Sequence, residues 1–180
     1  MAIRSVDQCS RRHLQKWLVE IILVKQFKGV GAIIVSESTG KVMTVLRSTR
    51  ETYPNTWTFA GGRVEANETP ADALRRELQE ELNLTKIKKI TPLHRYQSRS
   101  KDFIYDTFVV LVNKEFVPEL NWENAGYAWT SIDTLPNPLH PKARKMISSS
   151  RLIKKFKNFY SWVDNKNASR DNTISTEESS

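Results

Sequence analysis

The sequence is poor in cysteine and has no long apolar segment, and both features limit the kinds of protein that it can encode. Cys9 is the only cysteine among the 180 residues, so no disulfide can form within the sequence. The longest apolar run near the start, residues 17–24, contains Glu20 and is far too short to cross a bilayer. No small-residue cleavage site follows it, which makes it a poor secretory signal. We therefore expect a soluble cytoplasmic protein that does not bind membranes.

Acidic residues are scarce relative to basic ones. The chain has 20 Asp and Glu residues against 28 Lys and Arg residues, which gives a net charge of +8. Seven of the basic residues, and no acidic one, lie in residues 142–157. A basic surface attracts phosphate-bearing ligands and is compatible with RNA binding. A solvated basic face of a helix explains the same pattern at least as well.

The pattern of apolar residues predicts one domain with an α+β architecture. Residues 1–28 form a lead-in with a short helix or strand, residues 29–163 form the domain, and residues 164–180 form a polar tail that we expect to be disordered. Strands are predicted at residues 29–35, 42–46, 55–60, 103–112 and 127–130, and helices at 70–82 and at 142–162 with a break at 148–150.

The signals for the helix at residues 70–82 agree at both of its ends. Thr69 is a good N-cap, Pro70 suits the first helical position, and Asp72 lies where the acid of a capping box belongs. Asn83 tolerates the left-handed conformation that ends many helices. One face of this helix is apolar every fourth residue, at Leu74, Leu78 and Leu82.

Three acidic residues share the flank of this helix beside the leucine stripe. Glu77, Glu80 and Glu81 stand at positions i, i+3 and i+4, so their carboxylates lie on one face and repel one another. Mg²⁺ or Mn²⁺ would offset this repulsion, because hard divalent cations prefer carboxylate oxygens. A solvated acidic face is the alternative, although Arg75 and Arg76 are the only basic residues in the helix.

Residues 62–84 as a whole resemble the signature of the Nudix hydrolase family. The matching positions are Gly62, Glu68, Arg76-Glu77-Leu78, Glu80-Glu81 and Asn83-Leu84. The preceding segment, Trp57-Thr-Phe59-Ala-Gly-Gly62, is similar to the strand that enters the signature in this family. The chain departs from the family pattern at two positions: Asn83 replaces a glycine and Ala60 replaces a common proline. Neither change removes an acidic residue.

The resemblance implies a fold, a metal site and supporting residues. The fold is an α/β/α sandwich with a mixed β-sheet. The metal ligands would be Glu77, Glu80, Glu81 and the carbonyl oxygen of Gly61, with Glu77 and Glu80 also counted as catalytic. Gly62, Glu68 and Arg76 would hold the loop against the helix, the last two through a salt bridge. Arg63 is next to this site and could contact a phosphate or simply face solvent.

The general base and the remaining substrate contacts are less well defined by the sequence. Some Nudix enzymes use a glutamate of the helix, and others use an acid in a late loop. Glu123 is the candidate in such a loop here, and a surface acid in a turn is the alternative. His140 and Tyr127 are candidate substrate contacts, whereas His94 shows no spacing that suggests a site.

The resemblance implies Mg²⁺-dependent hydrolysis of a diphosphate linkage in a nucleoside diphosphate derivative or a nucleoside triphosphate. Alternatives are removal of pyrophosphate from RNA 5′ ends, or a nucleotide- or RNA-binding module without activity, which typically lacks some helix acids. The segment around Tyr127 and His140 is also similar to GDP-mannose mannosyl hydrolases. Those enzymes place a histidine base where this chain has Asn124. A homodimer is left open.

Overall fold

The computed structural model describes residues 26–161, which form a mixed six-stranded sheet between helices. The predicted lead-in up to residue 25 and the predicted tail at residues 164–180 lie outside the described residues. The strands run in the order β3-β2-β1-β5-β4, and β6 pairs with β2. The elements are β1 (Phe27–Ser36), β2 (Val42–Arg47), β3 (Trp57–Thr58), α2 (Pro70–Leu82), β4 (Lys89–Gln97), β5 (Phe103–Val112), β6 (Asn124–Thr130) and α3 (Pro141–Ile147).

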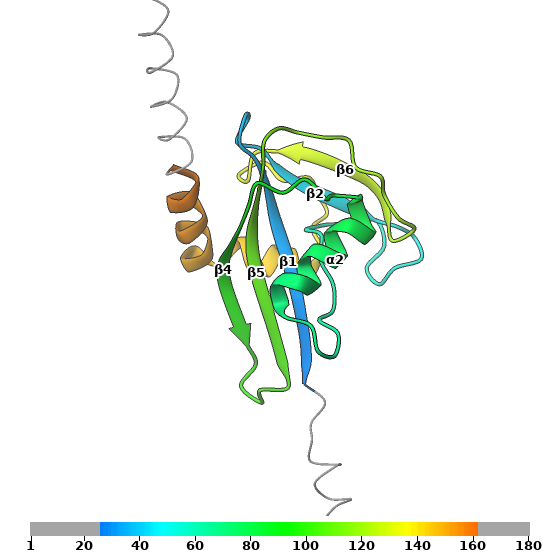
Figure 1. Cartoon of the computed structure of the whole chain (residues 1–180), viewed down its shortest axis with the longest axis vertical. Helices are drawn as coiled ribbons and strands as arrows, with labels where there is room; N and C mark the ends of the chain where they lie inside the picture. The colour runs from blue at the N-terminus through cyan, green and yellow to red at the C-terminus, as the bar shows by residue number, and fades with distance from the viewer. Residues whose placement is uncertain (1–25, 162–180) are drawn as a thin grey trace, which may run out of the picture.

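The centre of the sheet is the parallel pair of β1 and β5, which stay in register from Phe27↔Phe103 to Ser36↔Val112. Every residue of β1 from Gly29 onward is buried, as expected for a strand covered on both faces. All other strand pairs are antiparallel. The predicted α/β/α sandwich with a mixed sheet is therefore confirmed (Figure 1).

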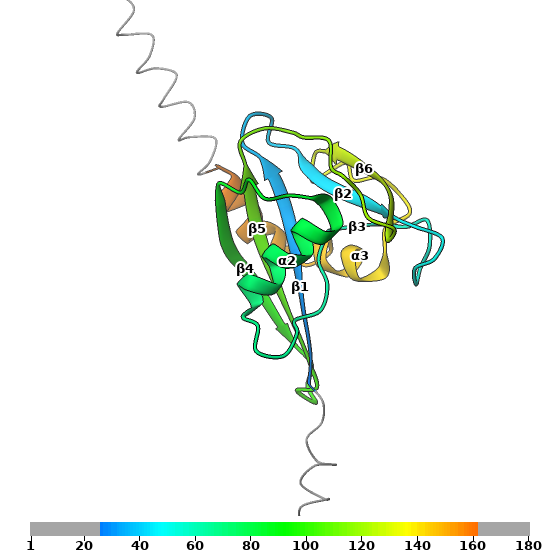
Figure 2. The ribbon, with the colours of Figure 1, turned by 45° about the vertical axis from the view of Figure 1, so that its right-hand side comes forward.

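The two faces of β1 pack against different helices, because successive side chains of a strand point to opposite faces. Val30, Ala32 and Ile34 belong to a core that includes Leu74, Leu78 and Leu82 of α2. Ile33 and Val35 belong to a second core that includes Ala143 of α3 and two residues of the following helical segment, 150–161. The helices α2 and α3 thus cover opposite faces of the sheet (Figure 2).

The bounds and both caps predicted for α2 are confirmed. The Thr69 hydroxyl oxygen accepts a hydrogen bond from the Asp72 N–H at 3.2 Å, and Pro70 is the first helical residue. At the other end, Asn83 adopts the left-handed conformation with φ of 50°, and its N–H bonds to the Gln79 carbonyl at 2.9 Å. The helix is thereby fixed in length, which sets where its last turn meets the sheet.

Three features differ from, or refine, the sequence-based prediction. Strand β4 was not predicted, because it is an edge strand with an exposed, irregular pattern and a bulge after Pro92. Strand β3 is shorter than predicted, since residues 60–62 bond along β1 instead: Ala32 N–H donates to the Ala60 carbonyl and Val30 N–H to the Gly62 carbonyl, both at 2.9 Å. The predicted break in the C-terminal helix occurs at residues 148–149.

Among residues 26–161, none of the helices is long and apolar enough to cross a membrane.

The leucine stripe of α2 generates a stability prediction. Leu78 is completely buried, so Leu78→Ala should lower the free energy of unfolding by about 2–5 kcal/mol, through lost burial and the cavity left behind. Gln79→Ala, at the neighbouring exposed position, should stay within about 0.5 kcal/mol of the wild type. Urea unfolding followed by circular dichroism measures both. Equal effects of the two substitutions would contradict the assignment of this face to the core.

Candidate active site

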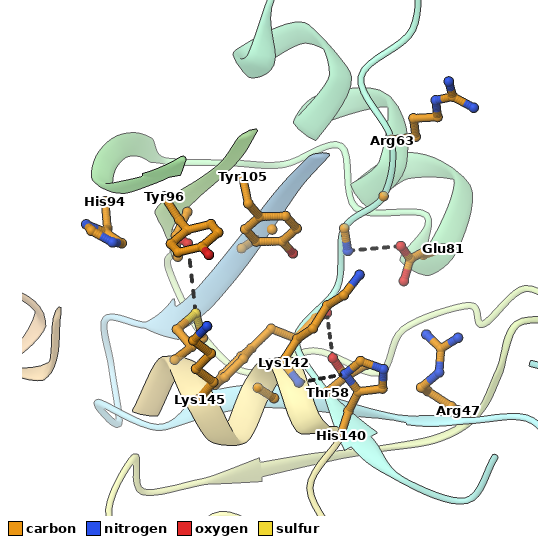
Figure 3. Close-up of a pocket in the computed structure, with 18 of the residues that line it drawn as sticks. Arg47, Thr58, Arg63, Glu81, His94, Tyr96, Tyr105, His140, Lys142 and Lys145 are labelled. Carbon is orange, nitrogen blue, oxygen red and sulfur yellow. Dashed lines mark hydrogen bonds between the residues drawn. The ribbon is translucent and has the colours of Figure 1, made fainter. Parts of the chain in front are cut away.

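A cavity of about 580 Å³ lies between the α3-facing side of the sheet and α3, and it reaches the last turn of α2. One end is formed by the loop at residues 59–63 together with Glu81, Glu123 and Asn124. The other end is aromatic and basic. Figure 3 shows Glu81 on one side of the cavity and Tyr96 with Lys145 on the opposite side, with Tyr105 and Lys142 between them. The cavity therefore has two ends of different chemistry.

Glu81 joins α2 to two other segments at the acidic end. Its carboxylate accepts hydrogen bonds from the Gly61 N–H at 2.9 Å and from Nδ2 of Asn124 at 3.1 Å. The residue is only 5% exposed, and burial raises the pKa of this carboxyl to about 7, although both hydrogen bonds and charges of nearby acids also act on it. Glu81 is thus a buried acid without a cationic partner among the described residues.

Arg76 holds the other two acids of the signature and links them to the loop. Its Nε and Nη2 bond to the two carboxylate oxygens of Glu68 at 2.8 and 3.1 Å, a bidentate pair that holds the Glu68 pKa below its usual range. Its Nη1 lies 2.9 Å from Glu77 and 3.2 Å from Glu80. Its Nη2 also donates to the Arg63 carbonyl at 2.9 Å. One guanidinium group therefore orders an acid of the loop, two acids of α2 and the backbone between them.

The carboxylate of Glu77 packs directly on the backbone of Gly62. A Cβ atom at position 62 would come within 2.4 Å of the Glu77 carboxylate, so any other residue there would require this carboxylate to move. Burial raises the pKa of Glu77, and the hydrogen bond from Arg76 opposes this shift. The close approach therefore favours glycine at position 62, the first residue of the signature.

Glu123 lines the same end of the cavity from the loop before β6. Its N–H donates to Oδ1 of Asn121 at 3.0 Å, and its carbonyl accepts from the Ser48 N–H at 2.7 Å, so the loop is held on two sides. Burial is the main cause that raises its pKa, followed by the charge of Glu51. The structure thus brings Glu123 together with Glu81, and the charge of Glu80 also acts on it.

His140 lies on the cavity wall at the N-cap of α3. Its Nδ1 accepts a hydrogen bond from the Lys142 N–H at 3.1 Å, so a neutral ring has its proton on Nε2. Burial, followed by the charges of Arg47 and Lys142, lowers its pKa and favours that neutral form. The ring of Tyr53 contacts it edge-on, with the centroids 5.0 Å apart. His140 can therefore present one N–H donor.

Several cavity residues were not identified from the sequence. Tyr105 is the clearest case: its ring lies over β1, and a Cβ atom on Gly31 would stand 2.3 Å from its hydroxyl oxygen. Arg47, Lys142 and Lys145 also line the cavity. Of these residues, only the basic ones were indicated by the sequence, through their part in the positive net charge. The predicted contact Tyr127 does not line this cavity, because its ring packs against the core on the α2 side.

The acidic end has the chemistry that a divalent cation requires. Glu81 and Glu123 line this end, and the charges of Glu77 and Glu80 act on them. Among residues 26–161, Arg76 is the only cation that forms a salt bridge with any of these four acids, and its partners are Glu77 and Glu80. The raised pKa values of Glu77 and Glu81 reflect negative charge that burial leaves poorly compensated. Within the described part of the chain, however, no three His, Cys, Asp or Glu side chains already stand in positions that enclose a metal ion. The donors fit a hard cation, and in this structure Glu77 and Glu80 are bonded to Arg76 and Glu81 to the Gly61 N–H.

Comparison with known proteins connects this arrangement to a family. Residues 25–149 match the NUDIX domain family. The chain is 32% identical over 118 residues to the nucleoside triphosphatase NudI of Escherichia fergusonii, covering 58% of this chain and 82% of that protein. It is 27% identical over 135 residues to the 8-oxo-dGTP diphosphatase of Haemophilus influenzae, covering 75% and 98%.

Solved structures show the same fold. The MutT NUDIX hydrolase of Burkholderia pseudomallei superposes with a TM-score of 0.54 at 24% identity, over 69% of this chain and 98% of that one.

The buried carboxyl of Glu81 makes stability depend on pH when no divalent metal is present. The pKa of this carboxyl is about 7 in the folded chain and near 4.5 in the unfolded chain. Its contribution to the free energy of unfolding is therefore fully present below pH 4.5 and is lost as the pH rises through 7. Relative to that of Glu81→Gln, the free energy of unfolding of the wild type should fall by on the order of 3 kcal/mol across this pH range. Urea unfolding with a chelator, at several pH values, measures the difference.

The exposed Glu65 provides a matched control, because Glu65→Gln removes the same charge outside the cavity. Its unfolding curve should run parallel to that of the wild type at all pH values. If the curve of Glu81→Gln also runs parallel, Glu81 is not the buried, poorly compensated acid described above.

Proposed function

Since this chain belongs to the NUDIX domain family and is a Nudix hydrolase, we propose that it hydrolyses nucleoside triphosphates with Mg²⁺. The bond cleaved would be the phosphoanhydride between the first and second phosphates, giving a nucleoside monophosphate and pyrophosphate. The observation that supports this most is the acidic end of the cavity, where Glu81 of the signature and Glu123 line a space large enough for a nucleotide. The two relatives above are named for activity on nucleoside triphosphates, which agrees with this substrate class.

The metal would be held by Glu77, Glu80, Glu81 and the carbonyl oxygen of Gly61. When bound, Mg²⁺ (or Mn²⁺ in its place) neutralises phosphate charge and orients the leaving group. Glu68 and Arg76 would keep these groups in place, because their bidentate salt bridge ties the loop to α2. Arg63 is available for a terminal phosphate, since within residues 26–161 its guanidinium makes no salt bridge and contacts only the ring of Phe27, at 5.3 Å.

Glu123 is the residue that we assign as general base. A water oxygen attacks phosphorus and forms the new P–O bond, while the bond to the bridging oxygen breaks and its electron pair stays with pyrophosphate. The water proton passes to the Glu123 carboxylate. This acid suits the role because it lines the cavity, its loop is held by hydrogen bonds, and burial raises its pKa toward neutrality.

The mannosyl-hydrolase alternative is disfavoured by Asn124. Its side chain is buried and donates to Glu81, and an amide cannot serve as a base at neutral pH. His140 does not replace it in that role, because its Nδ1 is occupied by the Lys142 N–H. We assign His140 to a nucleobase contact through Nε2–H. Location in the cytoplasm and a homodimer remain predictions from the sequence.

Glu80→Gln tests the metal site. It should lower kcat by about 100-fold or more, because it removes a carboxylate that would hold the metal, while nucleotide binding is retained. Mg²⁺-dependent release of nucleoside monophosphate and pyrophosphate from a panel of nucleoside triphosphates provides the assay. Glu65→Gln is the control and should keep full activity. Release of free sugar from nucleotide sugars, with no cleavage of triphosphates, would overturn the proposal.

Glu123→Gln tests the general base separately. It should lower kcat by about 10²–10⁴-fold with little change in KM, and the acidic limb of the pH–rate profile should disappear. An unchanged acidic limb would assign the base to a glutamate of α2 instead.

A further inference from the structure

The basic end of the cavity is not used by the reaction proposed above. Lys142 and Lys145 line the cavity, and within residues 26–161 neither forms a salt bridge. His94 lines the same end, and the charges of Lys155 and Arg151 act on it in addition to its burial. In Figure 3 this end, with His94, Tyr96 and Lys145, lies across the cavity from Glu81. It is therefore a region of positive potential away from the acids.

An aromatic wall lies under these cations. The rings of Phe27 and Phe103 are stacked with centroids 5.4 Å apart and planes within 9° of parallel. Tyr105 continues the stack at 6.3 Å, and Tyr96 lies 6.1 Å from Phe103. These side chains share one face of the sheet, because β1 and β5 pair in register at Phe27 and Phe103. Tyr96 is 41% exposed, so part of its ring is free for a ligand.

The ammonium groups of Lys142 and Lys145 lie over aromatic rings of this wall. Nζ of Lys145 is 5.1 Å from the ring centre of Tyr96, and Nζ of Lys142 is 5.7 Å from that of Phe103. Cation–π contacts at exposed sites are weak, so an anion entering the cavity can draw both ammonium groups away from the rings. Lysine ammonium groups beside partly exposed aromatic rings form the combination that binds single-stranded nucleic acid.

If the substrate is a nucleoside triphosphate, the basic end of the cavity has no anionic group to bind. All of its charge is on the 5′ side, where the acids and their cation would take it. The ribose and base are neutral, so the opposite end of the cavity would hold unpaired lysines against an uncharged group. A nucleotide that is also phosphorylated on its 3′ side would supply the missing anion.

We propose that the basic aromatic end binds the second nucleotide of a 5′-triphosphorylated RNA, and this rests on the proposed function of the acidic end. Lys142 and Lys145 pair with the phosphodiester, and the base of the second nucleotide contacts Tyr96 and Phe103. A free nucleotide with a 3′-phosphate has the same anion but lacks the second base.

The test compares kcat/KM for ATP, ATP with a 3′-phosphate and the triphosphorylated dinucleotide pppApA. The kcat/KM of the dinucleotide should exceed that of ATP by about tenfold, because stacking and the phosphodiester contact add to binding. Lys145→Gln and Tyr96→Ala should each reduce the ratio of the two kcat/KM values toward one. A merely structural defect would instead lower kcat/KM for the dinucleotide and for ATP together and leave their ratio unchanged. Arg144→Gln is the matched control, since it removes the same charge from α3 at a position outside the cavity, and its ratio should equal that of the wild type.

The outcomes are distinct. A wild-type ratio near one, or a ratio that Lys145→Gln and Tyr96→Ala leave unchanged, overturns the second-nucleotide site even if ATP is hydrolysed. A 3′-phosphorylated ATP that equals the dinucleotide also overturns it, because a free 3′-phosphorylated nucleotide is then sufficient. If no triphosphate is hydrolysed, the proposed function fails. Equilibrium binding of pppApA and ATP to Glu80→Gln protein then makes the same comparison without turnover.

Discussion

Glu81 accepts one hydrogen bond from the Gly61 N–H and another from the Asn124 amide, and these two bonds connect three parts of the chain. The end of α2, the loop that runs along β1 and the start of β6 meet at this one carboxylate. Because the carboxylate is buried, its charge is costly unless a cation approaches it. The same group therefore orders the acidic end of the cavity and favours the approach of a cation to it.

Arg76 supplies part of the missing positive charge. Its guanidinium group is fully used, with Glu68, Glu77, Glu80 and the Arg63 carbonyl as partners. The fork geometry of arginine makes this possible, since a lysine ammonium could not hold a bidentate carboxylate and a backbone carbonyl in one plane. Glu81 is left outside this network. Two acids of one helix face therefore share a cationic partner, and the third has none among residues 26–161.

The features that depend only on residues close together in the sequence, above all the helix α2, could be predicted from the sequence. The caps at Thr69 and Asn83 and the spacing of the glutamates lie within one helix, so α2 could be defined residue by residue. The partner of Glu81 could not be found in this way, because Asn124 is 43 residues away and reaches it only when β6 pairs with β2. Tyr105 was missed for a related reason: its place over Gly31 depends on the parallel pairing of β1 and β5. Strand β4 had no clear period to recognise.

The break at residues 148–149 gives the basic segment two different roles. Before the break, Lys142 and Lys145 of α3 face the cavity. After it, Lys157 pairs with Asp133 at 2.9 Å and Lys154 is exposed, as on an ordinary solvated helix face. The sequence alone treats these lysines as one charge run, because composition carries no direction. The break and the direction of each side chain on α3 together separate cations that line the cavity from cations that face solvent, since Arg144 precedes the break and is still outside the cavity. The positive charge that matters for a ligand is therefore a small part of the net charge of the chain.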